Sequence, residues 1–306
     1  MAMIKAKAIT LALSGGGARC AAHAGVLSVL DDVRIPVESI AGVSGGGLAG
    51  VLYALGYSPI AIRDYFADTQ LIEVWEFDPS RRAMFGAEKI RARARQMVGD
   101  KTFADLKFPV TLIATDLYNG REVHLNSGSL LDALVETMAI PAVIAPQTIS
   151  GMLLVDGGVV NPLPVNVARA MGKRVVAVEL GSHNRSPDHY TQLFEARGPM
   201  QVATEIAKRL QVAGIMESAH QAGVITSQRF IEMLITLHPP DVLIRPEVGQ
   251  MGLFAFDLSD EAYKQGEAAA RAQQTQLEAL ARPTLKSQID SMWKRVIQKP
   301  SRSPRP

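Results

Sequence analysis

The 306-residue sequence has little cysteine and no long apolar run. Cys20 is the only cysteine, so no disulfide can form within the chain and nothing indicates an oxidising compartment. No window approaches the roughly 20 consecutive apolar residues that span a bilayer, so any membrane contact is expected to be peripheral. The apolar stretch from Ala8 to Leu13 is also too short for a signal peptide. We therefore expect a cytoplasmic protein.

An excess of one charge is also missing. Lys and Arg number 32 and Asp and Glu 30, a formal net charge of +2 that gives no reason to expect a nucleic-acid partner. No group of His, Cys and Asp has the spacing of metal ligands, so neither a metal nor another cofactor is expected. Apolar residues make up 47 % of the chain, which is enough for the core of a globular domain. The composition indicates no oligomeric state.

Strand and helix patterns alternate through the first part of the chain. The apolar run "AITLAL" (8–13) precedes glycines and a helical pattern over 21–32, and "SIAGV" (39–43) precedes another helical pattern that ends near Gly56. Two such units predict an α/β fold with a mainly parallel central sheet flanked by helices. We expect one domain over residues 1–282, with a helical C-terminal extension and a basic, disordered tail over 283–306.

Three later segments carry local predictions. Two β segments meet at Asn119-Gly120, a pair typical of a tight hairpin turn. "LFAFDLS" (253–259) resembles a strand or an extended segment. Ser259 is placed to cap a helix that runs to about Ala281.

The stretch "SIAGVSGGGLAG" places Ser44 in a Gly-x-Ser-x-Gly pattern made by Gly42, Val43, Ser44, Gly45 and Gly46. This is the nucleophile-elbow pattern, in the strand-to-helix context that it requires. The serine hydroxyl should project from the carboxyl edge of the sheet, where ligands bind in open α/β folds. The alternative is a glycine-rich helix start that only packs tightly.

A second glycine run suggests an oxyanion site. "SGGGAR" (14–19) offers the bare N–H groups of Gly15, Gly16 and Gly17 at a strand end, ahead of a helix. Two other interpretations fit less well. Cys20 stands where a dinucleotide fingerprint has its third glycine, and the Gly-Lys-Ser/Thr ending of a phosphate-binding loop is missing.

A nucleophilic serine needs a base, and two residues are candidates. His183 follows the strand pattern "VVAVEL", where the histidine of an α/β-hydrolase triad would lie. Asp156 stands at another strand end and is followed by Gly157 and Gly158, which let a substrate or backbone come close. An aspartate in such a place is also typical of a turn or a helix cap.

In the order in which they occur, "SGGGARC", "GVSGGG" and "VDGG" resemble the patatin-like phospholipases, serine acyl hydrolases that use a Ser-Asp dyad. "IATDLYNGREV", "MAIPAVIAP" and "DGGVVNPLPV" are similar to the bacterial branch of that family. The resemblance covers about residues 8–180. It implies a three-layer sandwich, no cofactor, and hydrolysis of a phospholipid, a lysophospholipid or another fatty-acyl ester.

The resemblance also implies roles for single residues. It makes Ser44 the nucleophile, Asp156 its base and residues 15–17 the oxyanion loop. Arg19 is the basic residue that the family places after these glycines, where it steadies the loop, meets an anionic substrate or forms a salt bridge. Cys20 departs from the family, which usually has glycine there, so the packing at this point is altered.

The dyad places a physical demand on its base. An aspartate with a pKa near 4 is a poor base for a hydroxyl, so the site must raise that pKa by desolvation or rely on the oxyanion loop to stabilise charge; we expect Asp156 to be partly buried. Two alternatives remain open: an esterase with a Ser-His-Asp triad that uses His183, and a regulatory binding protein on the same fold.

Overall fold

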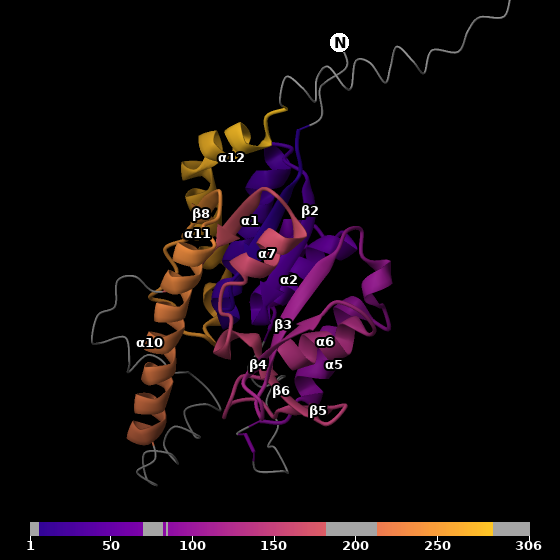
Figure 1. The fold of residues 1–306 in the computed structure, drawn as a ribbon, viewed down its shortest axis with the longest axis vertical. Helices are drawn as coiled ribbons and strands as arrows, with labels where there is room; N and C mark the ends of the chain where they lie inside the picture. Colours follow the sequence, from indigo (N-terminus) through magenta and orange to yellow (C-terminus); the bar gives the residue numbers. More distant parts are fainter. Residues whose placement is uncertain (1–5, 70–81, 84, 182–212, 284–306) are drawn as a thin grey trace, which may run out of the picture.

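The computed structural model describes residues 6–69, 82–83, 85–181 and 213–283, and it forms a sheet with helices on both faces (Figure 1). In the series β5-β6-β3-β2-β1-β7-β8, each strand is hydrogen-bonded to the next; β2 and β6 pair with different parts of one edge of β3, and β4 pairs with its other edge. The strands are β1 (Ile9–Leu13), β2 (Val37–Val43), β3 (Val110–Asp116), β4 (Arg121–Leu125), β5 (Gln147–Ile149), β6 (Met152–Asp156), β7 (Val175–Val178) and β8 (Val242–Ile244).

Five neighbouring strands, β3, β2, β1, β7 and β8, run parallel to one another. The strands β4 and β6 are antiparallel to β3, and β5 is antiparallel to β6. The predicted α/β class with a mainly parallel central sheet is confirmed.

Helices cover both faces of the sheet in the described part of the chain. The α-helices are α1 (Ala21–Asp32), α2 (Ser44–Leu55), α3 (Pro59–Ala67), α5 (Glu88–Val98), α6 (Leu130–Thr137), α7 (Val165–Met171), α10 (Ala213–Leu237), α11 (Ser259–Ala272) and α12 (Gln274–Ala281). Short 3-10 turns are η1 (Gly17–Cys20), η2 (Phe103–Asp105), η3 (Gly157–Val159) and η4 (Phe256–Leu258).

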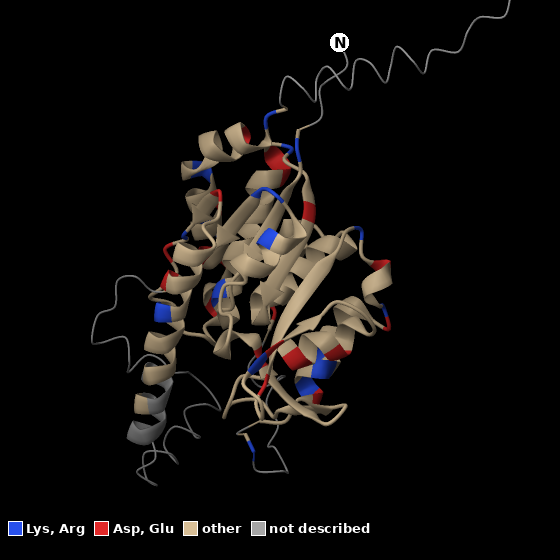
Figure 2. Ribbon diagram, in the orientation of Figure 1, with Lys and Arg blue, Asp and Glu red and all other residues tan. Residues whose placement is uncertain are grey.

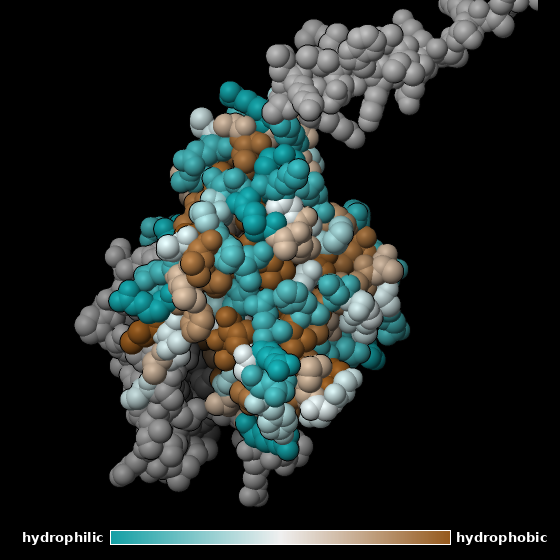
Figure 3. All heavy atoms as spheres, viewed as in Figure 1, coloured by the Kyte–Doolittle hydropathy of each residue, from teal (hydrophilic) through white to brown (hydrophobic). Residues whose placement is uncertain are grey.

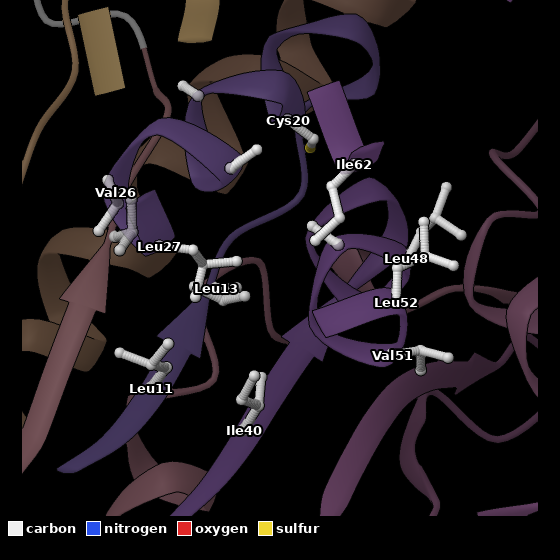
Figure 4. Packing of buried hydrophobic residues seen from close by; sticks show 14 of the residues in the cluster. Leu11, Leu13, Cys20, Val26, Leu27, Ile40, Leu48, Val51, Leu52 and Ile62 are labelled. Atoms are coloured by element: carbon white, nitrogen blue, oxygen red, sulfur yellow. The ribbon is translucent and has the colours of Figure 1, made fainter. Parts of the chain in front are cut away.

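The core lies in two layers because successive strand residues point to opposite faces. On one face, Leu11, Leu13 and Ile40 pack among apolar side chains of α1, α2 and α3 (Figure 4). On the other face, the smaller Ala12 and Ala41 pack against α7 and α10. Burying each large side chain is worth about 1.5–3 kcal/mol, so these layers fix the sheet on which the site is built.

The helices α1 and α11 cross with their backbones in contact. A methyl group built on Gly25 would lie 2.0 Å from the carbonyl oxygen of Tyr263, and one built on Gly266 would lie 2.0 Å from that of Ala22. Only glycine fits at such a crossing. Helix α11 is therefore packed tightly onto α1.

Two local predictions need correction. Within "LFAFDLS", residues 256–258 form the turn η4 rather than a strand, and the carbonyl of Leu253 accepts a hydrogen bond from Ala18 N–H at 2.8 Å. The segment thus pairs with the glycine loop and not with a sheet edge. Ser259 does not cap α11: it is the first residue of the helix, with its side chain buried, and Leu258 holds the cap position.

The β3–β4 hairpin is confirmed. Its turn spans residues 117–120, Asp116 pairs with Arg121, and Gly120 takes the positive φ of 63° that the turn requires. The predicted tail over 283–306 lies outside the described residues except for Pro283, and His183 lies outside them too.

The surface shown in the figures has mixed character. Basic and acidic residues alternate along the ribbon in Figure 2, and the space-filling view of Figure 3 shows apolar residues in patches broken by polar ones. No helix in the described ranges has the length and apolar character needed to cross a membrane.

Candidate active site

The sheet register brings Ser44 and Asp156 together. Strands β2 and β6 approach the same edge of β3 from opposite ends, while β4 occupies the other edge. Val43, the last residue of β2, pairs with Ile113, and Asp156, the last residue of β6, pairs with the next residue, Ala114. The ends of β2 and β6 therefore meet, and each carries one of the two predicted residues.

Ser44 occupies the turn between β2 and α2 in a strained conformation. Its φ is 54°, a left-handed value that is uncommon for a residue with a side chain. Its N–H donates a hydrogen bond of 2.9 Å to the Thr137 hydroxyl, which in turn donates one of 2.6 Å to the carbonyl of Ile113. The turn is thus tied to both α6 and β3.

The glycines of the serine motif are required by close backbone contacts. A methyl group on Gly46 would lie 2.3 Å from the carbonyl oxygen of Ser14, and one on Gly42 would lie 2.8 Å from Cα of Gly47. A side chain at either position would collide with neighbouring backbone, so only glycine fits there.

Asp156 is buried at the end of β6, as expected, with 7 % of its surface exposed. Burial raises the pKa of its carboxyl group to about 6, while hydrogen bonding to the Ser44 hydroxyl and to the Gly158 N–H lowers it in part. The bond from Gly158 is 2.8 Å long. At Gly157, an added methyl group would lie 2.3 Å from the Ile113 carbonyl oxygen, so β3 packs closely there too. Pairing of β6 with β3 thus holds the backbone of Asp156, and the Gly158 N–H holds the carboxyl group that is hydrogen-bonded to Ser44.

The glycine loop lies beside Ser44. A Cβ built on Gly15 would lie 3.3 Å from Cβ of Ser44, and Gly17 has a φ of 59°. Within the described residues, the N–H groups of Gly15, Gly16 and Gly17 donate no backbone hydrogen bond. Of the three, Gly15 is the one placed directly against Ser44.

Arg19 contacts the carbonyls of this region. Its Nε donates to the carbonyl of Gly16 at 3.2 Å, and its Nη1 donates to that of Leu180 at 3.4 Å. Both bonds join Arg19 to backbone carbonyls at or beside the glycine loop.

A model of the patatin-like phospholipase family matches residues 11–169. The chain belongs to this family. The matched range includes the glycine loop, Ser44 and Asp156. The resemblance stated from the sequence motifs is thereby confirmed.

Several proteins are similar to this patatin-like chain. An uncharacterised NTE family protein of Mycobacterium tuberculosis is 37 % identical over 187 residues, which cover 58 % of this chain and 51 % of that protein. Human patatin-like phospholipase domain-containing protein 6 is 32 % identical over 188 residues, 58 % of this chain and 14 % of that protein. The chain spans about half the length of its mycobacterial relative. Among solved structures, VipD from Legionella pneumophila is 11 % identical, with a TM-score of 0.47, over 90 % of this chain and 67 % of that one.

Cys20, where this patatin-like chain departs from the glycine usual in the family, is fully buried. Its sulfur is 2.8 Å from where a Cβ on Gly45 would be, so it fills the space next to that glycine. Burial raises the pKa of its thiol. With Cys20 in this place, Gly15 lies beside Ser44.

Sequence reasoning missed two polar residues of this patatin-like site. Thr137 is fully buried behind Ser44, and His23 is fully buried on α1, where its Nε2 lies 2.8 Å from the Ser14 carbonyl oxygen. A single histidine among the apolar and small residues of "AAHAGVL" was a signal for the second. Nothing in the local pattern around Thr137 distinguishes it from an ordinary helix end.

Proposed function

We propose that this chain hydrolyses the carboxylic ester bond of a phospholipid, a lysophospholipid or another fatty-acyl ester through an acyl-serine intermediate at Ser44. The observation that carries the proposal is the meeting of β2 and β6 on one edge of β3, which sets the Asp156 carboxyl against the Ser44 hydroxyl. Membership of the patatin-like phospholipase family supports the substrate class.

In the first half of the proposed reaction, Asp156 takes the proton of the Ser44 hydroxyl as its oxygen attacks the ester carbonyl carbon. The negative charge that develops on the carbonyl oxygen is stabilised by N–H groups of the loop formed by residues 15–17. When the tetrahedral intermediate collapses, the C–O bond of the ester breaks. The leaving alcohol or lysolipid takes the proton from Asp156, and the acyl group stays on Ser44.

In the second half, Asp156 takes a proton from a water molecule that attacks the acyl-serine. The second tetrahedral intermediate releases the fatty acid, and the Ser44 oxygen regains its proton. A base with a pKa of about 6 suits both steps, because it is mostly ionised at neutral pH yet binds a proton more strongly than an exposed aspartate does.

The first test is to map the site that a fluorophosphonate probe labels in the full chain. We expect labelling at Ser44 that falls sharply in Asp156→Asn and survives in His183→Ala. Asp116→Asn is the matched control, because Asp116 is another buried aspartate at the end of a neighbouring strand and binds its own turn through Tyr118 N–H.

Other outcomes would contradict the proposal in different ways. Labelling that depends on His183 instead of Asp156 would establish the triad esterase. A folded chain that is not labelled and does not hydrolyse any acyl ester, but co-purifies with a stoichiometric partner, would favour the regulatory binding protein. With a labelled chain, hydrolysis of phosphatidylcholine and lysophosphatidylcholine vesicles then tests the lipid class.

A further inference from the structure

His23 makes one hydrogen bond with its buried ring. The residue is fully buried, and its Nε2 lies 2.8 Å from the carbonyl oxygen of Ser14. Because a carbonyl only accepts hydrogen bonds, Nε2 must carry the proton. Nδ1 is buried and has no hydrogen-bond partner among the described residues. Burial also lowers the pKa of His23 to about 4, so the ring is neutral at pH 7.

The bonded carbonyl belongs to the peptide that leads into the glycine loop. The Ser14–Gly15 peptide is trans, so its C=O and N–H groups point in opposite directions. The Ser14 oxygen is directed into the protein, towards His23 on α1 and against the backbone of Gly46 on α2. The N–H of Gly15 therefore points away from His23 and Gly46, and Gly15 itself is partly exposed and lies beside Ser44.

The same arrangement recurs two residues further on. Arg19 holds the carbonyl of Gly16, so the N–H of Gly17 points away from the Arg19 side chain. The carbonyl of Ser14 is thus fixed by His23 of α1, and that of Gly16 by Arg19 of η1. The thiol of Cys20 is 3.9 Å from the Ser14 oxygen and is a weak donor, so His23 provides the strong hydrogen bond to that carbonyl.

We propose that His23 is a positioning residue for ester hydrolysis: by holding the Ser14 carbonyl, it aims the Gly15 N–H at the oxyanion that forms beside Ser44. The inference rests on the proposed function. It differs from a purely structural role, in which the ring would only fill space and satisfy a buried carbonyl.

Two substitutions separate these roles. His23→Leu keeps a side chain of similar bulk and removes the donor, whereas His23→Gln retains an N–H at a comparable distance from the backbone. With p-nitrophenyl butyrate as the probe, we expect His23→Leu to lower kcat about 100-fold, as the loss of an oxyanion donor does, with KM within about threefold of wild type. The kcat of His23→Gln should be at least tenfold higher than that of His23→Leu.

Each result bears on a different claim. An unchanged kcat in a folded His23→Leu variant, beside an active wild type, would overturn the inference and leave the proposed function standing. A wild type that neither hydrolyses the ester nor labels at Ser44 would overturn both.

A measurement on the wild type covers the case in which His23→Leu does not fold. The 15N spectrum of the histidine side chains reports which ring nitrogen carries the proton. We expect His23 to have protonated Nε2 and unprotonated Nδ1 at pH 7. Protonation at Nδ1 alone would overturn the inference, because Nε2 could not then donate to Ser14.

Discussion

Replacing Thr137 by valine should loosen the turn that carries Ser44. The threonine hydroxyl accepts the Ser44 N–H at 2.9 Å and donates to the Ile113 carbonyl at 2.6 Å, and the side chain is fully buried. Valine has nearly the same shape but can neither accept nor donate a hydrogen bond. The Ser44 N–H then loses its partner in a buried place, which typically costs about 1–3 kcal/mol, and the Ile113 carbonyl loses one of its bonds. We expect the free energy of unfolding to fall by about 2–4 kcal/mol.

The bond also holds a residue whose backbone is strained. A left-handed conformation with a side chain costs about 1–3 kcal/mol, and it persists only when neighbouring groups enforce it. Without the Thr137 hydroxyl, we expect Ser44 to leave this conformation part of the time, and its labelling by a fluorophosphonate should slow by tenfold or more.

Urea unfolding followed by circular dichroism measures the first effect, and the rate of labelling measures the second. Thr137→Ser is the matched control, because serine keeps both hydrogen bonds and loses only a methyl group. It should lie within about 1.5 kcal/mol of wild type and be labelled at a similar rate. A valine variant with wild-type stability and wild-type labelling would refute the reasoning.

Two further predictions concern charge and packing. Because the pKa of Asp156 is raised to about 6 in the folded chain and an unfolded aspartate titrates near 4, the folded state binds more protons between these values. The contribution of Asp156 to the free energy of unfolding should therefore fall as pH rises from 4 to 6, and Asp156→Asn should remove this pH dependence. Labelling of Ser44 should rise through about pH 6. Labelling that is flat from pH 5 to 7 would argue against Asp156 as the base. At the α1–α11 crossing, Gly266→Ala should lower the free energy of unfolding by about 1–3 kcal/mol, because its methyl group would lie 2.0 Å from the Ala22 oxygen. Gly223→Ala on α10, where an added Cβ meets nothing within 4 Å, should leave stability unchanged or raise it by up to about 1 kcal/mol, and equal losses in urea unfolding for the two variants would contradict the close crossing.

The sequence predicted those parts of the fold that local patterns specify. The units at β1–α1 and β2–α2 follow from short apolar runs, glycines and helical periodicity, and Gly42 and Gly46 follow from the crowding at a strand-to-helix turn. The roles of Ser44 and Asp156 remain predictions until the labelling experiment tests them.

What local patterns could not predict depends on contacts between distant segments. The antiparallel placement of β6 against β3 is a tertiary pairing that "LLVD" alone does not encode. Thr137 acts through one hydroxyl at a helix end, and Leu253, just before the turn at residues 256–258, accepts a hydrogen bond from Ala18 of the glycine loop. In each case the partner lies far away in the chain.

The end-to-end meeting of β2 and β6 has a consequence for how such a site can diverge. Both strand ends are set by pairing with consecutive residues of β3, Ile113 and Ala114, and not by the length of chain between them. Connecting segments, such as the turn over residues 117–120, can gain or lose residues without moving Ser44 relative to Asp156. A slip of β6 by a single residue, in contrast, would turn the carboxylate to the opposite face of the sheet. Segments that connect these strands can therefore change in length while β3 keeps Ser44 and Asp156 together.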